Sequence, residues 1–184
     1  MDLTEKKTGG REIYSGHVVH LYVDDILLPD GGSAKREVLR HSGAVCIAPV
    51  NSKRELLFVR QFRYAVGREL LELPAGRIDA GEDPQLTGIR ELREETGYIA
   101  HDVSYVGRLF PTPGYSDEVI WLYVCTVDSE NVGTDTDDGE FVDTVAIPFD
   151  KAVEMVMNDE LFDSKTQILL LRLNEAVRIG KIFI

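Results

Sequence analysis

The feature that most restricts the fold is a loop and helix at residues 76–97, set between segments that are typical of β-strands. Upstream lie the apolar runs AVCIAPV and ELLFVRQFRYA, and the Pro- and Gly-containing segment LLELPAGRIDAGEDP then breaks their pattern. Asp83 followed by Pro84 is a typical helix start, and Gly97 is a typical stop. We therefore expect a structured loop followed by a helix over residues 84–96.

The rest of the chain mixes strand and helix signals. Residues 11–28 and the segment KREVLRH are typical of strands, with the turn PDGGS between them. Later strands are expected at VSYVGRLF, EVIWLYVCTV and VDTVAIP, and helices at residues 150–158 and 164–179. A chain of 184 residues is long enough for one main domain and a small appendage. We expect a β domain over residues 1–42 and a main domain over residues 43–184.

Charge and hydropathy exclude several classes of protein. The formal charge of −12 repels polyanions, so we expect no nucleic-acid partner. No apolar run reaches the roughly 18 residues that a membrane span needs, and the N-terminal MDLTEKKTGGREIY lacks the apolar segment of a secretory signal. Cys46 and Cys125 lie inside strand-like apolar runs, as buried thiols usually do. A cytoplasmic protein without membrane contact is expected.

The helix over residues 84–96 has two different sides on a wheel of about 100° per residue. One side carries four residues: Leu86, Ile89, Leu92 and Thr96. The other side carries Glu91, Glu94 and Glu95, whose i, i+3 and i+4 spacing brings their carboxylates together. Because like charges at this spacing destabilise a helix, a positive group is expected among them.

Two interpretations fit this acidic cluster. Mg²⁺ prefers oxygen ligands and commonly binds one or two carboxylates together with substrate phosphates, so the cluster suits a metal site. Alternatively, the glutamates form a solvated acidic face whose repulsion is relieved by Arg90 and Arg93. The helix by itself leaves both interpretations open.

The segment GRIDAGEDPQLTGIRELREETG, residues 76–97, resembles the signature of the Nudix hydrolases at every fixed position. Tyr98 departs from the usual aliphatic residue at a position that we expect to pack. Gly88 is unusual inside a helix and indicates close packing on a sheet. The resemblance implies an α+β protein with a Nudix α/β/α sandwich and a mixed β-sheet, beside a small N-terminal antiparallel β-sheet domain.

The resemblance also implies roles for residues at matching positions. The implied metal ligands are a backbone carbonyl and three carboxylates: Ala75, Glu91, Glu94 and Glu95. Glu94 and Arg90 are implied as catalytic residues, and Glu82 as a supporting residue. The implied cofactor is Mg²⁺, with Mn²⁺ as the alternative. A divalent cation suits diphosphate hydrolysis because it neutralises phosphoryl oxygens and acidifies a bound water.

Three further segments resemble the ADP-ribose pyrophosphatase branch of the family. They are VRQFRYAVGRELLELPAG, KTQILLL and LFPTPGYSDEVIWLYV, in which Pro113 lies 16 residues after Gly97. The resemblance implies conversion of ADP-ribose to AMP and ribose 5-phosphate, with GDP-mannose or another nucleoside diphosphate-linked compound as the alternative small-molecule substrate. It also implies a homodimer with exchanged N-terminal domains. A non-catalytic sensor of nucleotide sugars is the alternative of a different class.

Candidate substrate-binding residues lie before and after the loop and helix. Arg63 is expected to bind a phosphate or ribose, although a surface arginine on a strand also fits its sequence context. Glu72 and Arg60 are weaker candidates. Tyr115 and Glu118 are expected beside the pocket, and capping of a strand is the alternative role of each.

An acidic loop is the expected source of a general base. Seven carboxylates and no Lys or Arg lie between Asp128 and Asp143. Glu140 is the first candidate because it directly precedes the strand-like FVDTVAI, which would anchor it. Asp138 and Asp137 remain alternatives, and so does a loop whose carboxylates only solvate it.

Overall fold

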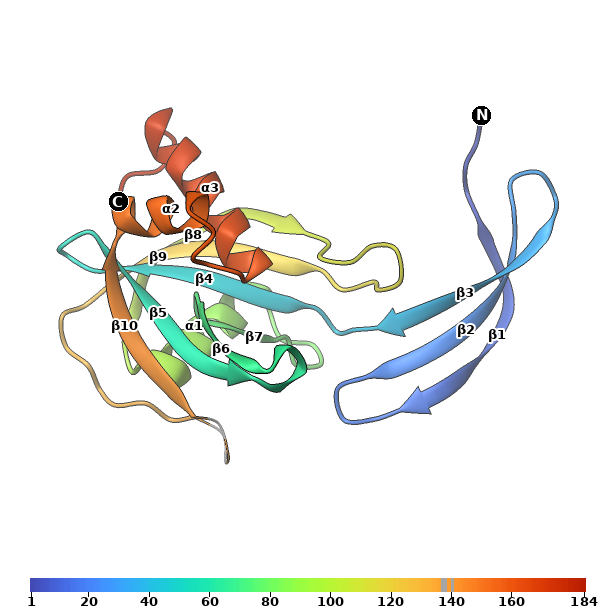
Figure 1. The fold of residues 1–184 in the computed structure, drawn as a ribbon, viewed down its shortest axis with the longest axis horizontal. Helices are drawn as coiled ribbons and strands as arrows, with labels where there is room; N and C mark the ends of the chain where they lie inside the picture. Colours follow the sequence, from blue (N-terminus) through green and yellow to red (C-terminus); the bar gives the residue numbers. More distant parts are fainter. Residues whose placement is uncertain (137–138, 140) are drawn as a thin grey trace. The chain divides into compact units, whose positions relative to one another are not determined.

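The computed structural model describes residues 1–136, 139 and 141–184 of the chain. The chain forms two compact units, both drawn in Figure 1. Met1–Gly43 and Phe110–Val119 make up the first unit, and Ala44–Leu109 and Ile120–Ile184 make up the second. The segment Phe110–Val119 therefore belongs with the N-terminal strands, although the sequence places it inside the main domain.

The N-terminal unit is an antiparallel sheet in which each strand pairs with the next along the chain. Its strands are β1 (Lys6–Ser15), β2 (His20–Leu27) and β3 (Ser33–Arg40). Asp24 in the middle strand is 4% exposed and forms ion pairs of 2.5 Å with Lys7 on one side and Arg40 on the other. Because both carboxylate oxygens are paired, the buried charge is compensated.

The segment Phe110–Val119 is attached to β3 by backbone and side-chain bonds. Leu39 donates its N–H to the carbonyl of Tyr115 at 2.7 Å, and Asp117 donates its N–H to the carbonyl of Leu39 at 3.2 Å. Arg40 also forms an ion pair of 3.1 Å with Asp117. The loop that contains Tyr115 and Glu118 is therefore fixed within the N-terminal unit.

The second unit is built around a mixed sheet in the order β10-β5-β4-β9-β8, with β6 paired to β5 and β7 paired to β4. Its strands are β4 (Ala44–Val50), β5 (Glu55–Arg63), β6 (Arg68–Glu72), β7 (Ala75–Arg77), β8 (Ala100–Leu109), β9 (Ile120–Val127) and β10 (Val142–Pro148). The pairing of β4 with β9 is parallel, and the other pairings are antiparallel. A short 3₁₀ helix, η1 (Tyr64–Val66), follows β5.

Helices cover both faces of this sheet, with α1 (Pro84–Thr96) on one face and α2 (Phe149–Met157) and α3 (Ser164–Arg178) on the other (Figure 1). None of the helices in the described part of the chain is long and apolar enough to span a membrane. The layers confirm the α+β class and the sandwich of helices around a mixed sheet that the sequence predicts.

Strand β4 is apolar throughout because its two faces pack against different helices. Val45 and Ile47 lie in the core cluster that contains Leu92 of α1, whereas Cys46 and Ala48 lie in the cluster that contains α3. This alternation follows from the two-residue period of a strand. Gly88 lies against β4, since an added Cβ would come within 3.1 Å of Val45 Cγ2. The predicted close packing at Gly88 is confirmed.

Two local predictions were wrong. Residues 70–77 were expected in a loop, but most of them lie in β6 and β7, which are separated only by Leu73 and Pro74. Strand β7 is only three residues long, and Pro74 and Gly76 give this segment a sequence pattern that is typical of a turn. Leu86 was placed on the apolar side of the helix but is 60% exposed. Leu92 and Thr96 of that side are buried as predicted, and the other buried positions of α1 are Thr87, Gly88 and Glu95.

Candidate metal centre

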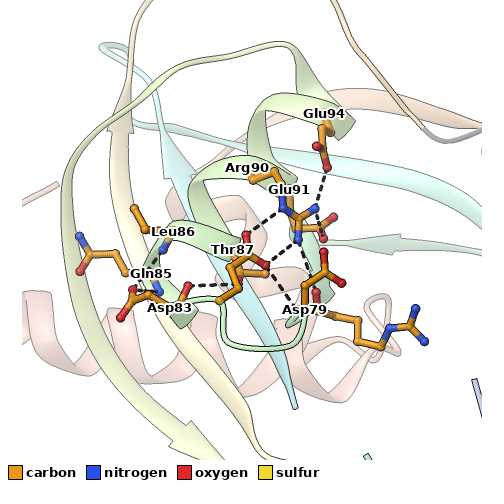
Figure 2. A network of polar contacts seen from close by, with 10 residues as sticks. Asp79, Asp83, Gln85, Leu86, Thr87, Arg90, Glu91 and Glu94 are labelled. Carbon is orange, nitrogen blue, oxygen red and sulfur yellow. Dashed lines mark hydrogen bonds and ion pairs between the residues drawn. The ribbon is translucent and has the colours of Figure 1, made fainter. Parts of the chain in front are cut away.

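The ends of α1 fix the register of its glutamates. The Asp83 side chain accepts hydrogen bonds from the N–H groups of Gln85 at 2.8 Å and Leu86 at 3.3 Å, which caps the start of the helix (Figure 2). Gly97 has a φ of 74° and donates its N–H to the carbonyl of Arg93 at 2.8 Å, which ends the helix in the left-handed region that glycine favours. The predicted bounds of this helix are therefore confirmed.

Arg90 supplies the positive charge that the acidic cluster requires. Its Nη1 donates to Glu91 Oε1 at 2.8 Å and to Glu94 Oε2 at 2.9 Å, and Figure 2 shows the guanidinium between these two carboxylates. Its Nε donates to Glu82 Oε1 at 3.0 Å, and this pairing lowers the pKa of the Glu82 carboxyl to about 2. The same bonds raise the pKa of Arg90. The loop before α1 is thus tied to the helix through one arginine.

Glu95 and Glu91 lie directly against the start of β7. Glu95 is 3% exposed, and its Oε2 accepts the N–H of Ala75 at 3.2 Å. A Cβ placed on Gly76 would lie 1.9 Å from the carboxyl carbon of Glu91, so the absence of a side chain at Gly76 makes room for that carboxylate. The structure therefore brings the backbone of β7 and the carboxylates of α1 together.

The residues present fit a hard divalent cation. Carboxylate oxygens are ligands that such ions prefer, and the carboxylates of Glu91 and Glu95 lie against the backbone of β7. Within the described residues, no group of three or more His, Cys, Asp or Glu side chains is already arranged to hold a metal ion. Arg90 instead shares one N–H-bearing nitrogen between Glu91 and Glu94. An ion at these oxygens would replace those two hydrogen bonds.

Arg63 and Glu72, two candidate substrate residues, are bonded to each other. The Nε and Nη2 of Arg63 donate to the two carboxylate oxygens of Glu72 at 2.7 and 2.8 Å. Lys165 of α3 also pairs with Glu72, and it forms a second ion pair of 2.9 Å with Asp163. The Glu72 side chain is only 2% exposed, whereas 42% of the Arg63 side chain is exposed. Arg63 is therefore the member of this pair that can meet a ligand.

The Glu72 carboxylate is ionised at neutral pH. Burial raises its pKa, but the hydrogen bonds from Arg63 and the charge of Lys165 outweigh burial and hold the pKa at about 2. Sequence reasoning missed Lys165, which stands out only as a cation in the first turn of a helix, where the helix dipole disfavours it.

The other candidate residues have different surroundings in their own units. Arg60 is three residues before Arg63 on β5, so the two side chains point to opposite faces, and Arg60 pairs with Asp143 at 2.6 Å. Tyr115 is exposed, and Glu118 lies 3.9 Å from His41; both belong to the N-terminal unit.

Glu140, Asp138 and Asp137, the candidate general bases, lie outside the described residues. The part of the loop before them is bound to the end of α1. Asn131 Nδ2 donates to the carbonyl of Thr96 at 2.9 Å, and the N–H of Asp135 donates to the carbonyl of Glu94 at 2.9 Å. These bonds satisfy carbonyls that a helix end otherwise leaves without partners.

Comparison with known proteins identifies the family. The model of the NUDIX domain matches residues 39–172, which include α1, β7 and the whole acidic cluster. The chain belongs to the NUDIX family. This match confirms the predicted Nudix membership. The relatives described next include an ADP-ribose pyrophosphatase, as the resemblance to that branch predicts.

Two relatives match this chain almost from end to end, and a third matches about three quarters of it. The ADP-ribose pyrophosphatase of Bacillus subtilis strain 168 is 36% identical over 184 residues, covering 97% of this chain and 98% of the relative. The methanol dehydrogenase activator of Bacillus methanolicus is 37% identical over 177 residues, covering 95% and 96%. A GDP-mannose pyrophosphatase of Salmonella paratyphi B is 36% identical over 146 residues, covering 74% and 75%.

A solved structure has the same fold. The crystal structure of an ADP compounds hydrolase superposes with a TM-score of 0.86 and 20% sequence identity, covering 99% of this chain and 100% of that one. At this identity the likeness concerns the fold of the NUDIX chain alone.

Replacing Gly76 with Ala is expected to weaken metal binding while the fold is kept. The new Cβ must displace the Glu91 carboxylate, which is the far end of a flexible side chain, so the backbone need not move. We expect the dissociation constant of Mn²⁺, measured by EPR titration without substrate, to rise at least about tenfold, as when the support of a metal ligand is lost.

Gly114→Ala is the matched control, because a Cβ at Gly114 meets nothing within 4 Å. Its Mn²⁺ affinity and melting temperature are expected to equal those of the wild type. Wild-type Mn²⁺ affinity in a folded Gly76→Ala protein would contradict the placement of Glu91 at the metal site.

Proposed function

We propose that this NUDIX enzyme is a Mg²⁺-dependent pyrophosphatase of nucleoside diphosphate sugars that converts ADP-ribose to AMP and ribose 5-phosphate. One observation carries the proposal: the carboxylates of α1 gather against the backbone of β7 around Arg90. The nearly complete match to an ADP-ribose pyrophosphatase supports this choice of substrate.

The proposed metal ligands are the Ala75 carbonyl and the carboxylates of Glu91, Glu94 and Glu95. When bound, Mg²⁺ supplies charge neutralisation at the phosphoryl oxygens and lowers the pKa of a water molecule, and Mn²⁺ is the alternative ion. Arg90 holds the carboxylates in place before the metal binds. When the metal ion replaces its hydrogen bonds to Glu91 and Glu94, Arg90 keeps its hydrogen bonds to Glu82.

Arg63 is the proposed phosphate-binding group. Glu72 engages its Nε and Nη2, so the Nη1 edge of the guanidinium faces away from that carboxylate and can donate to a phosphate oxygen. A fixed cation matters here because the chain carries a net charge of −12, which repels a diphosphate. Arg60, Tyr115 and Glu118 remain proposed contacts to the rest of the substrate.

In the proposed reaction, a water oxygen attacks one phosphorus atom as the bridging P–O bond breaks. A carboxylate accepts the proton of the water, and the bridging oxygen leaves with the other phosphate, so one water is consumed for each AMP and ribose 5-phosphate formed. Glu140 is the proposed acceptor, with Asp138 and Asp137 as alternatives.

A substrate panel with Mg²⁺ tests the proposed activity. The panel contains ADP-ribose, GDP-mannose, NADH, diadenosine polyphosphates and nucleoside triphosphates, and the products are identified by chromatography. We expect ADP-ribose to give the highest kcat/KM. Preference for GDP-mannose would favour the alternative substrate, which the match to a GDP-mannose pyrophosphatase supports. Turnover of none of these compounds would support the non-catalytic sensor.

Glu95→Gln is expected to lower turnover by orders of magnitude without unfolding the protein, because a neutral amide is a poorer ligand for a hard cation. Glu154→Gln, on the exposed side of α2, is the matched control and should retain wild-type kcat. Near-normal turnover in a folded Glu95→Gln protein would contradict the proposed role of Glu95 as a metal ligand.

Glu140→Gln tests the general base. Because proton removal matters mainly in the transition state, we expect kcat to fall steeply while KM and Mg²⁺ affinity stay nearly constant. A loss confined to Mg²⁺ affinity would make Glu140 a metal ligand, and an unchanged kcat would favour Asp138.

We also propose a homodimer that exchanges its N-terminal domains. The N-terminal sheet is small and exposes several large apolar side chains: Ile13, Tyr14, Val18, Val19 and Leu27. Light scattering at micromolar concentration should therefore give twice the mass of the chain. A fully active monomer would contradict the dimer. The cytoplasmic location stays a prediction, which cell fractionation tests.

One match supports a second candidate function. The relative named as a methanol dehydrogenase activator is as similar to this chain, and over as much of its length, as the ADP-ribose pyrophosphatase. Adding the purified chain to a methanol dehydrogenase assay tests this role, and loss of any stimulation in Glu95→Gln would tie it to the same metal site.

A further inference from the structure

The segment Glu72–Ala75, between β6 and β7, carries two groups of the proposed site. Glu72 accepts two hydrogen bonds from the guanidinium of Arg63, and the carbonyl of Ala75 is the proposed metal ligand. Only Leu73 and Pro74 separate these two residues, and both are buried. A shift of this short segment would therefore move the phosphate-binding arginine and the metal ligand together.

Three separate elements hold the backbone of this segment. The N–H of Leu73 donates to Thr166 Oγ1 of α3 at 2.9 Å. The carbonyl of Pro74 accepts the N–H of Ile47 in β4 at 3.0 Å, and the N–H of Ala75 donates to Glu95 of α1. Thr166 is fully buried and lies 93 positions along the chain from Leu73, so this bond is a long-range contact.

The neighbouring Lys165 holds the start of the same segment. It is the second residue of α3, where the helix dipole disfavours a cation, and its side chain is only 12% exposed. A buried cation at the start of a helix does not stabilise the helix, so the position of Lys165 needs another explanation. Its ion pairs with Glu72 and Asp163 provide one, because Lys165 joins the first turn of α3 to the carboxylate that orients Arg63.

Helix α3 is a rigid support for these two residues. Leu169, Leu170 and Leu173 are fully buried in the core cluster on one face of the sheet. Side chains packed in such a core cannot shift without loss of contacts. The first turn of α3 is therefore fixed relative to the sheet before any ligand arrives.

We propose that Lys165 and Thr166 are positioning residues of the active site: Thr166 fixes the Ala75 carbonyl for the metal, and Lys165 fixes the Glu72–Arg63 pair for the diphosphate. The proposal rests on the proposed function and extends it to the segment KTQILLL, whose role the sequence leaves open. Neither residue touches the substrate in this account, and both act through the segment Glu72–Ala75.

A pair of substitutions at Thr166 tests the metal half. Thr166→Val keeps the size of the side chain but removes the acceptor of the Leu73 N–H, whereas Thr166→Ser keeps the hydroxyl. EPR titration of Mn²⁺ without substrate should give a dissociation constant at least about tenfold higher for Thr166→Val and near the wild-type value for Thr166→Ser.

Leu173→Ala separates positioning from general loss of stability. It creates a cavity about two helical turns along α3 from Thr166, and it is expected to lower the melting temperature while Mn²⁺ affinity stays at the wild-type value. A Thr166→Val protein that is destabilised but binds Mn²⁺ like the wild type would overturn the metal half of the proposal.

Substitutions at Lys165 test the diphosphate half. Lys165→Met removes one of the two cations that pair with Glu72, which loosens the carboxylate that orients Arg63. The KM for ADP-ribose should therefore rise about tenfold or more, with a smaller change in kcat. Lys165→Arg should recover most of the loss, since it restores a cation at the same place. An unchanged KM in a folded Lys165→Met protein would overturn this half.

The two failures can be distinguished. If the wild type hydrolyses no compound of the substrate panel, the proposed function fails, and the Mn²⁺ titrations of the Thr166 variants still decide whether α3 positions the metal site. If the wild type is active but both pairs of variants behave like it, the positioning roles fail alone.

Discussion

The structure depends most on one electrostatic arrangement, the crowding of carboxylates along one helix beside an arginine. Glu91 and Glu94 share Nη1 of Arg90, whose Nε bonds Glu82 in the preceding loop. Without a cation, carboxylates at this spacing would repel one another and weaken the helix. The same arrangement suits exchange with a divalent ion, because Arg90 can give up two bonds and still keep its place through Glu82.

The surrounding fold supports this arrangement from both faces of the sheet. On one face, α1 packs on β4 closely enough that Gly88 leaves no space for a larger residue without adjustment. On the other face, α3 is buried through its leucines and reaches the edge of the site with Lys165 and Thr166. The short segment between β6 and β7 lies between these supports. Distant parts of the chain therefore fix the proposed metal ligand Ala75 and the proposed phosphate-binding Arg63 together.

Local signals in the sequence predicted much of this. Asp83, Pro84 and Gly97 gave the bounds of α1 correctly because capping depends on a few neighbouring residues. The helical wheel predicts Leu86 on the apolar side, but Leu86 is exposed, because the side of α1 that packs on β4 is the one that contains Gly88. Strands β6 and β7 were missed because their pairing with β5 and β4 is a tertiary effect that a short Pro- and Gly-containing segment does not reveal.

Long-range contacts account for what the sequence could not predict in the site. The sequence makes Glu72 a weaker candidate for substrate binding and does not reveal its bonds to Arg63 and Lys165, in which it is a buried counter-ion. The bond from Leu73 to Thr166 joins residues that no local pattern connects. The metal ligands stay a proposal that the family resemblance implies, and three of the four lie on one helix, where local spacing alone brings their carboxylates together.

The most direct test of the account is anomalous diffraction from crystals of the protein soaked with Mn²⁺. We predict a peak about 2.1 Å from oxygens of Glu91, Glu94, Glu95 and the Ala75 carbonyl, with Arg90 no longer bonded to Glu91 and Glu94. A well-occupied Mn²⁺ site elsewhere, with Arg90 still between those two carboxylates, would contradict it.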